Sequence, residues 1–346
     1  MNWQPRPTLK AIAEATGLSI AAVSMALRDH SSLPAATIAR VKKAAQAMNY
    51  TPNPAASALA AHRKGLQVHR DFSVIALVSN WTNRDEWVRR ESAKQLLAGA
   101  TERARTYGYE LQHLWAREGG MTPQRFSRVL VARGIRGVIL APLEDPEGRF
   151  ELDWARFTVV TIERIARYPH FHHIVPNYFA DLRLAWDQLR ERGYRRIGLV
   201  IEHSLAERVA HQWEAAHAFA QAGLGPANPG VPSLVVGDIQ PQEMIRAWLR
   251  EHRPDAVICR CPHVLGAIAA ARLRMPRDIG YVGLNVVDDA PHVSGILQHR
   301  DVMGATAVDV MHSLLHRHHR GPNAISQGTH VDGSWQEGRT VAKRAG

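Results

Sequence analysis

Two histidine-rich runs and a pair of cysteines are the residues whose types and spacing most directly suggest chemistry. The histidines stand in HFHH at 170–173 and in HRHH at 316–319, and the cysteines are Cys259 and Cys261. A zinc site needs ligands that converge, usually with carboxylate or thiolate help, whereas these runs are typical of a solvated, weakly basic surface. The cysteines are too close in sequence for ordinary disulfide geometry. The sequence therefore predicts no metal site and no disulfide, and it favours a reducing, cytoplasmic compartment.

Signatures of catalysis or of nucleotide binding do not occur in the sequence. It contains no Walker A loop, no G-x-G-x-x-G fingerprint and no G-x-S-x-G elbow. No nucleophile and base can be paired by their spacing, so we expect neither enzymatic activity nor a cofactor. The opening MNWQPRPTLK lacks the apolar core of a signal peptide, and no apolar run is long enough to span a bilayer. We therefore expect neither export nor a membrane span.

The positive charge of the chain is concentrated near its N-terminus. The formal net charge of the 346 residues is +11. Residues 1–64 hold eight Lys and Arg against two acidic residues, so more than half of the excess lies there. This distribution indicates a polyanionic partner. The same region contains SIAAVSMALR at 19–28, which carries apolar side chains where a base-reading helix usually carries Arg, Gln or Asn.

Three short helices must position that stretch. Leu9, Ile12 and Ala13 share one helical face, and Ser19 is a residue type that caps the start of a second helix. A third helix is predicted over residues 34–48, where apolar side chains recur at helical spacing. Three helices of this length in a basic segment are typical of a small helical domain.

From about residue 72 onward, apolar runs typical of buried strands alternate with helical patterns. The runs are FSVIALVS, GYELQHLW, IRGVILAP, FTVVTIE, RRIGLVI, SLVVG, DAVICRC and IGYVGLN. Near-continuous apolar strands separated by helices predict parallel sheets that are covered on both faces. The segment is long enough for two such lobes. The predicted fold class is therefore α + α/β, with an N-terminal helical domain followed by a two-lobed α/β domain.

Four motifs follow one another in the first 60 residues: TLKAIAEATGLS, AAVSMALR, ATIARVKKAAQAMNYTPN and PAASALA. Together they resemble the helix-turn-helix and hinge of the LacI/GalR family of bacterial transcription regulators. RGIRGVILAP, LRERGYRRIGLV and PRDIGYVGLN are similar, more weakly, to the periplasmic-binding-protein-like sensor of that family. The resemblance implies a helix-turn-helix DNA-binding domain in 1–52, a hinge helix and linker in 53–70, and a two-lobed ligand-sensing and dimerisation domain in 71–346.

The resemblance assigns DNA-binding roles to a set of N-terminal residues. Ile20, Ala21 and Met25 take base-facing positions, where they suit thymine methyl groups but cannot form bidentate hydrogen bonds to guanine. Ser19 is placed to hold a phosphate through its hydroxyl and the helix amides. Pro34 replaces the Ser or Thr that usually caps the third helix. The full predicted set is Thr8, Ser19, Ile20, Ala21, Ser24, Met25, Arg28, Thr37, Tyr50, Asn53, Ala56 and Leu59.

The hinge motif supplies a second mode of DNA recognition. Leu59 matches the lever leucine of the family, which inserts into a minor-groove step from each half of a dimer and kinks the duplex. Small residues such as Ala56 allow a close approach to the groove floor. One such helix is too short to be stable alone, so we expect an effector to act by ordering or melting the pair. Part of the sequence specificity is then expected from DNA deformability.

Several positions at which the family holds its effector carry other residues here. Asn177 and Asn285 stand where carboxylates are common, and His211 stands where many members have an Arg that grips the effector. Arg208, one helical turn before His211, is able to replace that charge. The predicted effector site, in the cleft between the lobes, is Trp81, Trp87, Asn177, Arg208, His211, Arg260 and Asn285. A sugar or related metabolite is expected, while a protein partner or no effector stays open.

The sequence as a whole predicts a cytoplasmic DNA-binding transcription regulator. We expect a repressor that binds a pseudopalindromic operator as a homodimer and whose DNA affinity responds to the effector. The alternative is a solute-binding or catabolic protein in which the two-lobed fold carries the main activity. The basic helical domain at the N-terminus favours the regulator.

Overall fold

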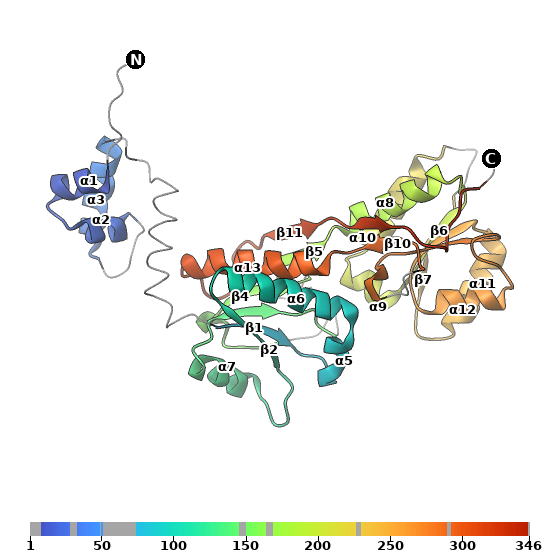
Figure 1. Ribbon diagram of the computed structural model, residues 1–346, viewed down its shortest axis with the longest axis horizontal. Helices are drawn as coiled ribbons and strands as arrows, with labels where there is room; N and C mark the ends of the chain where they lie inside the picture. Colours follow the sequence, from blue (N-terminus) through green and yellow to red (C-terminus); the bar gives the residue numbers. More distant parts are fainter. Residues whose placement is uncertain are drawn as a thin grey trace, which may run out of the picture. The chain divides into compact units, whose positions relative to one another are not determined.

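The computed structural model describes residues 8–27, 33–48, 50, 74–144, 150–163, 169–225, 230–288 and 292–344. The chain divides into two compact units, one within residues 1–69 and the other within 70–346 (Figure 1). The predicted domain boundaries at residues 52 and 70 fall in the segment 51–73, outside the described residues.

The first unit is built from three helices: α1 (Leu9–Thr16), α2 (Ile20–Ala26) and α3 (Ala35–Ala47). The turn between α1 and α2 contains Gly17, whose φ of 65° is a left-handed conformation that glycine adopts without strain. This turn sets the two helices at 98° to each other. The arrangement is that of a helix-turn-helix. Pro34 precedes α3 and makes no side-chain capping hydrogen bond.

The core of the first unit draws on all three helices. Ile12, Val23 and Val41 are completely buried, one from each helix. The remaining buried members are Ala13, Ala26 and Ala45. The spacing of Leu9, Ile12 and Ala13 that predicted one helical face is therefore confirmed, since all three belong to this cluster.

The second unit contains two largely parallel sheets that define its two lobes. Lobe 1 has the strand order β11-β5-β4-β3-β1-β2, and lobe 2 has the order β12-β10-β9-β8-β6-β7. The strands of lobe 1 are β1 (Val74–Ser79), β2 (Glu110–Trp115), β3 (Gly137–Leu140), β4 (Thr158–Ile162), β5 (His172–Pro176) and β11 (Gly328–Val331). Those of lobe 2 are β6 (Ile197–Glu202), β7 (Leu234–Val236), β8 (Ala256–Arg260), β9 (Gly280–Gly283), β10 (Gly295–Leu297) and β12 (Ser334–Gln336).

Helices cover both faces of each sheet (Figure 1). Lobe 1 carries α5 (Arg84–Arg89), α6 (Glu91–Thr106), α7 (Pro123–Ala132) and α13 (Arg300–His316). Lobe 2 carries α8 (Tyr178–Glu191), α9 (His203–Arg208), α10 (Gln212–Ala222), α11 (Pro241–His252) and α12 (His263–Ala270). Short 3-10 turns occur at Trp154–Arg156 and Val286–Asp288.

The alternation of side chains along the strands explains these layers. In β1, Ile75 and Leu77 pack with α6 and α13, whereas Ala76 and Val78 pack with α7 on the other face. The predicted parallel sheets with both faces buried are therefore confirmed. On one face, α6 and α13 lie side by side (Figure 1). They approach so closely that a Cβ at Gly304 would lie 2.2 Å from the carbonyl oxygen of Leu96.

The chain passes between the lobes at three places within the described residues. It crosses after β5, between β10 and α13, and between β11 and β12. The carboxyl ends of the parallel strands therefore lie next to these crossings, which is where ligands of such sheets bind.

One predicted helix differs from the structure. The sequence predicts a single helix from about residue 87 to 107, but the structure has α5 and α6 separated at Arg90, whose ψ of 137° is extended. The guanidinium of Arg90 lies 4.5 Å from the ring centre of Trp81, so a tertiary contact accompanies the break.

Within the described part of the chain, no single helix is long and apolar enough to cross a bilayer. The bent pair α1 and α2 satisfies the length and composition criteria only when the two helices are taken together.

Candidate DNA-recognition helix and lobe junction

Helix α2 is anchored by one face and exposes the other. Val23 and Ala26 are fully buried, whereas Ile20 in the first turn is 49 % exposed. Ala21 is exposed, and Ser24 and Met25 are partly buried. An exposed isoleucine at a helix start does nothing for the core, so the helix presents an apolar surface that another molecule can cover.

Ser19 fixes the start of α2. Its backbone is extended, its Oγ accepts a hydrogen bond from the amide of Ala22 at 3.1 Å, and its carbonyl accepts one from the amide of Val23 at 3.0 Å. Ser19 therefore satisfies one of the free first-turn amides, and the others remain available to an anion.

The other predicted DNA-binding residues that the structure describes belong to the same unit. Thr8 caps α1, and its Oγ1 accepts a hydrogen bond from the amide of Ala11 at 3.3 Å. Thr37 is partly buried on α3, and Tyr50 packs against the helical core. Arg28, Asn53, Ala56 and Leu59 lie outside the described residues.

At the lobe junction, Arg208 of lobe 2 reaches across to lobe 1. Its Nη1 donates to the carbonyl oxygen of Leu143 and its Nη2 to that of Glu144, both at 2.8 Å. Nη1 also lies 3.4 Å from Oε2 of Glu163. Leu143 and Glu144 follow β3, and Glu163 follows β4, so this one side chain ties lobe 2 to the carboxyl ends of two strands of lobe 1.

Glu163 stands between two arginines. Its Oε1 accepts a hydrogen bond from Nη1 of Arg300 at 3.1 Å, while Oε2 faces Arg208. Only 8 % of Glu163 is exposed, and its backbone has a φ of 65° that is uncommon for a residue with a Cβ. Burial by itself raises the pKa of this carboxyl group, but the charges of Arg208 and Arg300 outweigh burial and hold the pKa below its ordinary value.

The buried network continues into the crossings between the lobes. Nη2 of Arg300 donates to Oε1 of Gln298 at 2.9 Å, and Nε2 of Gln298 donates to Oδ2 of Asp181 at 3.1 Å. The other oxygen of Asp181 accepts the amide of Gly333 at 2.9 Å. Burial raises the pKa of Asp181 to about 6, although the hydrogen bonds from Gly333 and Gln298 oppose the shift. Nδ2 of the predicted residue Asn177, in the crossing after β5, donates to Asp332, in the crossing between β11 and β12, at 2.7 Å. Gln298 lies in the crossing before α13 and bonds to Asp181, which also accepts from Gly333, so all three crossings meet in this region.

The two predicted tryptophans have different surroundings. The indole Nε1 of Trp81 donates to the carbonyl oxygen of Pro142 at 2.9 Å, so Trp81 contacts the same loop that receives Arg208. Trp87 is 4 % exposed and belongs to the core of lobe 1, with its ring 5.4 Å from that of His113. Both tryptophans therefore belong to the hydrophobic core of lobe 1, and Trp81 also contacts the junction loop through its indole N–H.

Two asparagines at strand ends carry unpaired buried oxygens. Asn285, a predicted site residue that follows β9, is 4 % exposed, and Asn80, which follows β1, is 5 % exposed. The Oδ1 atom of each has no hydrogen-bond partner among the described residues. A buried acceptor without a donor is unfavourable, so both positions suit a ligand that supplies hydroxyl or N–H groups.

The last two predicted effector residues lie on lobe 2. Arg260 is the final residue of β8 and is partly buried. His211 is exposed, and its ring nitrogens lie 2.8 Å from Glu214 and 3.2 Å from Glu207. The hydrogen bond that His211 donates to Glu214 raises the pKa of His211. His211 is thus engaged with its own helix and its neighbour, while Arg208 makes the contact across the junction.

Sequence reasoning missed four members of the junction: Asp181, Glu163, Gln298 and Arg300. A signal for Glu163 was present, because an acidic residue directly after the buried run FTVVTI has to be paired. No comparable pattern marks Arg300, which meets Glu163 only because α13 returns from lobe 2 to lobe 1.

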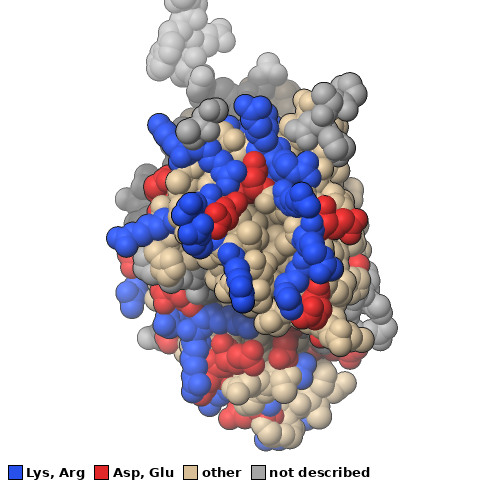
Figure 2. Space-filling view, turned by 90° about the vertical axis from the view of Figure 1, so that its right-hand side faces the viewer, with Lys and Arg blue, Asp and Glu red and all other residues tan. Residues whose placement is uncertain are grey.

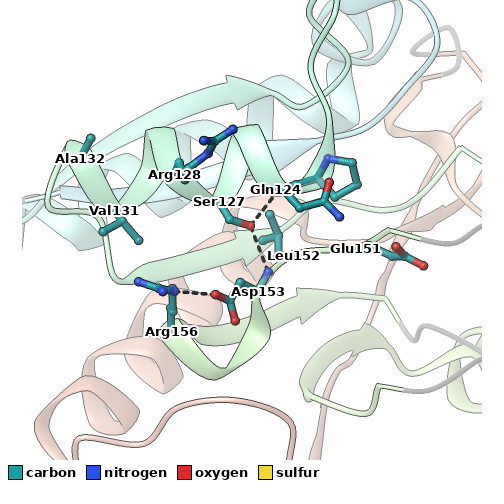
Figure 3. Close-up of a pocket in the computed structure, with 10 residues that line it drawn as sticks. Gln124, Ser127, Arg128, Val131, Ala132, Glu151, Leu152, Asp153 and Arg156 are labelled. Atoms are coloured by element: carbon teal, nitrogen blue, oxygen red, sulfur yellow. Dashed lines mark hydrogen bonds and ion pairs between the residues drawn. The ribbon is translucent and has the colours of Figure 1, made fainter.

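A separate cavity of about 540 Å³ lies on lobe 1 between α7 and the 3-10 turn at Trp154–Arg156. Figure 3 shows Ser127 hydrogen-bonded to the backbone of Asp153, and Arg156 paired with the Asp153 carboxylate. None of the residues that line this cavity belongs to the junction network.

The geometry defines a class of protein: a helix-turn-helix unit joined to a two-lobed α/β unit of the ligand-binding type. Residues 8–53 match the family model for bacterial regulatory proteins of the lacI family. Residues 186–338 match the model for a periplasmic binding protein-like domain.

Curated relatives agree with these matches. The HTH-type transcriptional repressor PurR of Serratia proteamaculans is 26 % identical over 326 residues, covering 88 % of this chain and 89 % of the relative. PurR of Salmonella paratyphi B is 31 % identical over 156 residues, covering 40 % of this chain and 43 % of the relative. The chain belongs to the lacI family, and it is a DNA-binding transcription regulator with a ligand-binding-type sensor.

Solved structures share the fold. The complex of the regulator CelR with cellobiose has a TM-score of 0.58 at 18 % identity, covering 97 % of this chain and all of that chain. The lac repressor dimer bound to operator and the anti-inducer ONPF has a TM-score of 0.55 at 20 % identity, covering 98 % of this chain and all of that chain.

Proposed function

We propose that the chain is a repressor that binds a pseudopalindromic operator as a homodimer. The observation that carries this proposal is α2, a capped helix with a buried inner face and an exposed apolar outer face led by Ile20. Its N-terminal half enters the major groove, where Ile20, Ala21 and Met25 contact thymine methyl groups and Ser19 holds a phosphate. PurR and the lac repressor, which are relatives or fold neighbours, are named as repressors.

The hinge contributes the rest of the specificity in this proposal. Leu59 inserts into the central minor-groove step, and Ala56 lets the helix approach the groove floor. Leu59→Ala is then expected to lower affinity for the operator much more than affinity for unrelated DNA. Equal losses on both duplexes would argue against insertion.

The effector in this proposal is a neutral polyhydroxyl compound such as a sugar. Arg208 already donates to two carbonyls and faces Glu163, so it offers no free charge to an anion. Asn80 and Asn285 instead present acceptors that need donors, which hydroxyl groups supply. Trp81 contacts the loop at the same junction through its indole N–H, although it is 8 % exposed and the guanidinium of Arg90 lies over its ring. The fold neighbour CelR was solved with cellobiose.

Selection from a pool of random duplexes, followed by fluorescence anisotropy, tests the operator proposal. We expect an enriched sequence with two inverted half-sites, bound about 10³-fold or more tightly than unrelated DNA. Binding that does not discriminate between sequences would contradict it and favour the solute-binding alternative.

A thermal-shift screen that includes neutral sugars and their phosphorylated and carboxylated analogues tests the effector proposal. We expect stabilisation by a neutral sugar and loss of that stabilisation in Asn285→Leu. Stabilisation by the anionic analogues alone would overturn the proposed ligand class.

A further inference from the structure

The end of lobe 1 at which its strands begin carries the two histidine runs that the proposed function leaves unused. The hydroxyl of Thr158, the first residue of β4, donates to the carbonyl oxygen of His319 at 2.5 Å. The amide of Asn323 donates to the carbonyl of His170 at 3.0 Å. The rings of His172 and His319 lie 6.3 Å apart. The segments 170–173 and 316–320 thus form one surface, which we call the entry edge.

The chain enters lobe 1 at this same edge. Val74 begins β1, and the register pairs Ile75 with Gly137 on β3 and Gly137 with Thr158 on β4. Two strand spacings, about 10 Å, therefore separate the start of β1 from Thr158 on β4, whose hydroxyl donates to the carbonyl oxygen of His319. The residues immediately before Val74 lead back to the helix-turn-helix unit. The entry edge is the part of lobe 1 that is tethered most directly to the DNA-binding unit.

Arginines give the entry edge an uncompensated positive charge. Arg317 and Arg320 are exposed and form no ion pair or hydrogen bond with any described side chain. Asp309, the acidic residue nearest to Arg317 in the sequence, lies 3.7 Å from Arg103 and accepts a hydrogen bond from Tyr107, so it is engaged elsewhere. Burial and the neighbouring His318 lower the pKa of His316, so that ring adds hydrogen-bonding capacity rather than charge at neutral pH.

Two simpler explanations leave the arginine pair unexplained. A basic residue at a helix C-terminus interacts favourably with the helix dipole, which suits Arg317 next to the end of α13, but Arg320 lies beyond the last turn. A metal site is excluded for His172, because its Nδ1 accepts the amide of Gln327 at 2.9 Å and its proton is then on Nε2. The described residues contain no group of three potential metal ligands.

We propose that the entry edge is a second DNA-contacting surface, which binds phosphates of the duplex that α2 reads, outside the base pairs that α2 contacts. This inference rests on the proposed function, because it requires that the helix-turn-helix unit be bound to DNA. The tether holds Arg317 and Arg320 at high local concentration near that duplex. Arginine is suited to the contact because its guanidinium binds phosphate in a bidentate manner.

The outer end of lobe 2 provides a matched control surface. Figure 2 shows lysines and arginines gathered around a hollow on this face. A groove of about 430 Å³ on lobe 2 is lined by Arg246, Arg250 and Arg253, among others. Arg250 and Arg253 are exposed and unpaired among the described residues, as Arg317 and Arg320 are, but they lie on the other lobe, away from Val74. Removing two charges from either surface changes the net charge equally.

Salt titrations on two duplex lengths test the proposal. The full-length protein, R317Q/R320Q and R250Q/R253Q are titrated by anisotropy against the selected operator, in a duplex of about 20 base pairs and in one of about 40. On the longer duplex we expect R317Q/R320Q to lower the slope of log Kd against log salt by about 0.9 for each phosphate that the variant no longer binds. On the shorter duplex we expect the slope to match the unsubstituted protein.

The controls decide between the remaining outcomes. R250Q/R253Q is expected to leave both slopes unchanged, and thermal unfolding checks that both variants fold. Equal slopes for all three proteins on the longer duplex, or equal reductions by both variants, would overturn the proposal. The same titrations with unrelated DNA test the proposed function separately. If the unsubstituted protein binds the operator and unrelated DNA equally well on both duplex lengths, the proposed function fails, whatever the slopes of the two variants.

Discussion

The recognition helix and the lobe junction depart from the usual distribution of side chains in opposite directions. In α2, Ile20 is 49 % exposed at a position where a polar residue would be unremarkable. At the junction, Glu163 is 8 % exposed although charged residues are rarely buried. The apolar surface is open to a partner outside the chain, whereas the buried charges have their partners within it. We propose that the first region binds another molecule, while the second ties lobe 2 to lobe 1.

The largest expected effect comes from removing the carboxylate of the junction. Glu163→Ala leaves Arg208 and Arg300 without their shared partner, and removing one member of a buried ion pair costs about 3–5 kcal/mol. Urea unfolding followed by tryptophan fluorescence measures the change. Glu243→Ala removes an exposed partner of Arg246 and is expected to cost about 1 kcal/mol or less. Similar losses of unfolding free energy in the two variants would show that the ion pairs of the junction stabilise the chain no more than an exposed surface pair does.

A pH-dependent effect of the junction is expected next in size. The pKa of Asp181 rises from 3.8 to about 6 on folding, so the folded chain binds the proton more tightly than the unfolded chain. The contribution of Asp181 is then greatest below pH 4 and is lost as the pH rises through 6, a change of about 3 kcal/mol.

Asp181→Asn should remove that part of the pH dependence. Urea unfolding between pH 4 and 7 is compared for the unsubstituted protein, Asp181→Asn and the exposed control Asp187→Asn. We expect the free energy of unfolding of Asp181→Asn to change less between pH 4 and 7 than that of the other two proteins. A parallel pH profile for Asp181→Asn would contradict the assigned role of burial at this position.

In α2, two apolar residues one turn apart should separate binding from stability. Val23→Ala removes buried methyl groups and is expected to destabilise the first unit by about 1 kcal/mol. Ile20→Ala is expected to change stability by less than about 0.5 kcal/mol, while lowering operator affinity several-fold. Thermal unfolding and anisotropy on the same samples measure both. Loss of stability in Ile20→Ala would mean that this side chain belongs to the core.

An effect no larger than that of Val23→Ala is expected at the cap of α2. Ser19→Ala removes the hydrogen bond to the amide of Ala22 and is expected to cost about 1 kcal/mol of stability. Ser19→Asp keeps a capping oxygen but adds a negative charge where a phosphate is proposed to bind. It should therefore retain stability while losing operator affinity, and unchanged affinity would argue against a phosphate at this helix end.

The elements that the sequence predicts well are those whose pattern is set by burial alone. Val23 and the alternating residues of β1 follow directly from apolar spacing. The break at Arg90 was missed because it goes with a cation–π contact to Trp81 that no local pattern encodes. A position after a strand also does not determine the direction of a side chain. Trp81 and Trp87 both lie in the core of lobe 1, and the indole N–H of Trp81 also donates to the junction loop.

The candidate junction was predictable only in part, for a related reason. Arg208 was identified from its place beside the effector position of the family. Its partner Glu163 lies 45 residues away, and Arg300 lies 137 residues from Glu163. Arg208 meets Glu163 from the other lobe, whereas the return of α13 to lobe 1 is what brings Arg300 to Glu163.

The most direct test of apolar readout by α2 is to remove thymine methyl groups from the selected operator. Each thymine is replaced by uracil in turn, and Kd is measured by anisotropy for the unsubstituted protein and for Ile20→Ala. We predict that uracil at one or more half-site positions weakens binding of the unsubstituted protein and has a smaller effect on Ile20→Ala. Unchanged Kd values at every uracil position would contradict recognition through the apolar face of α2.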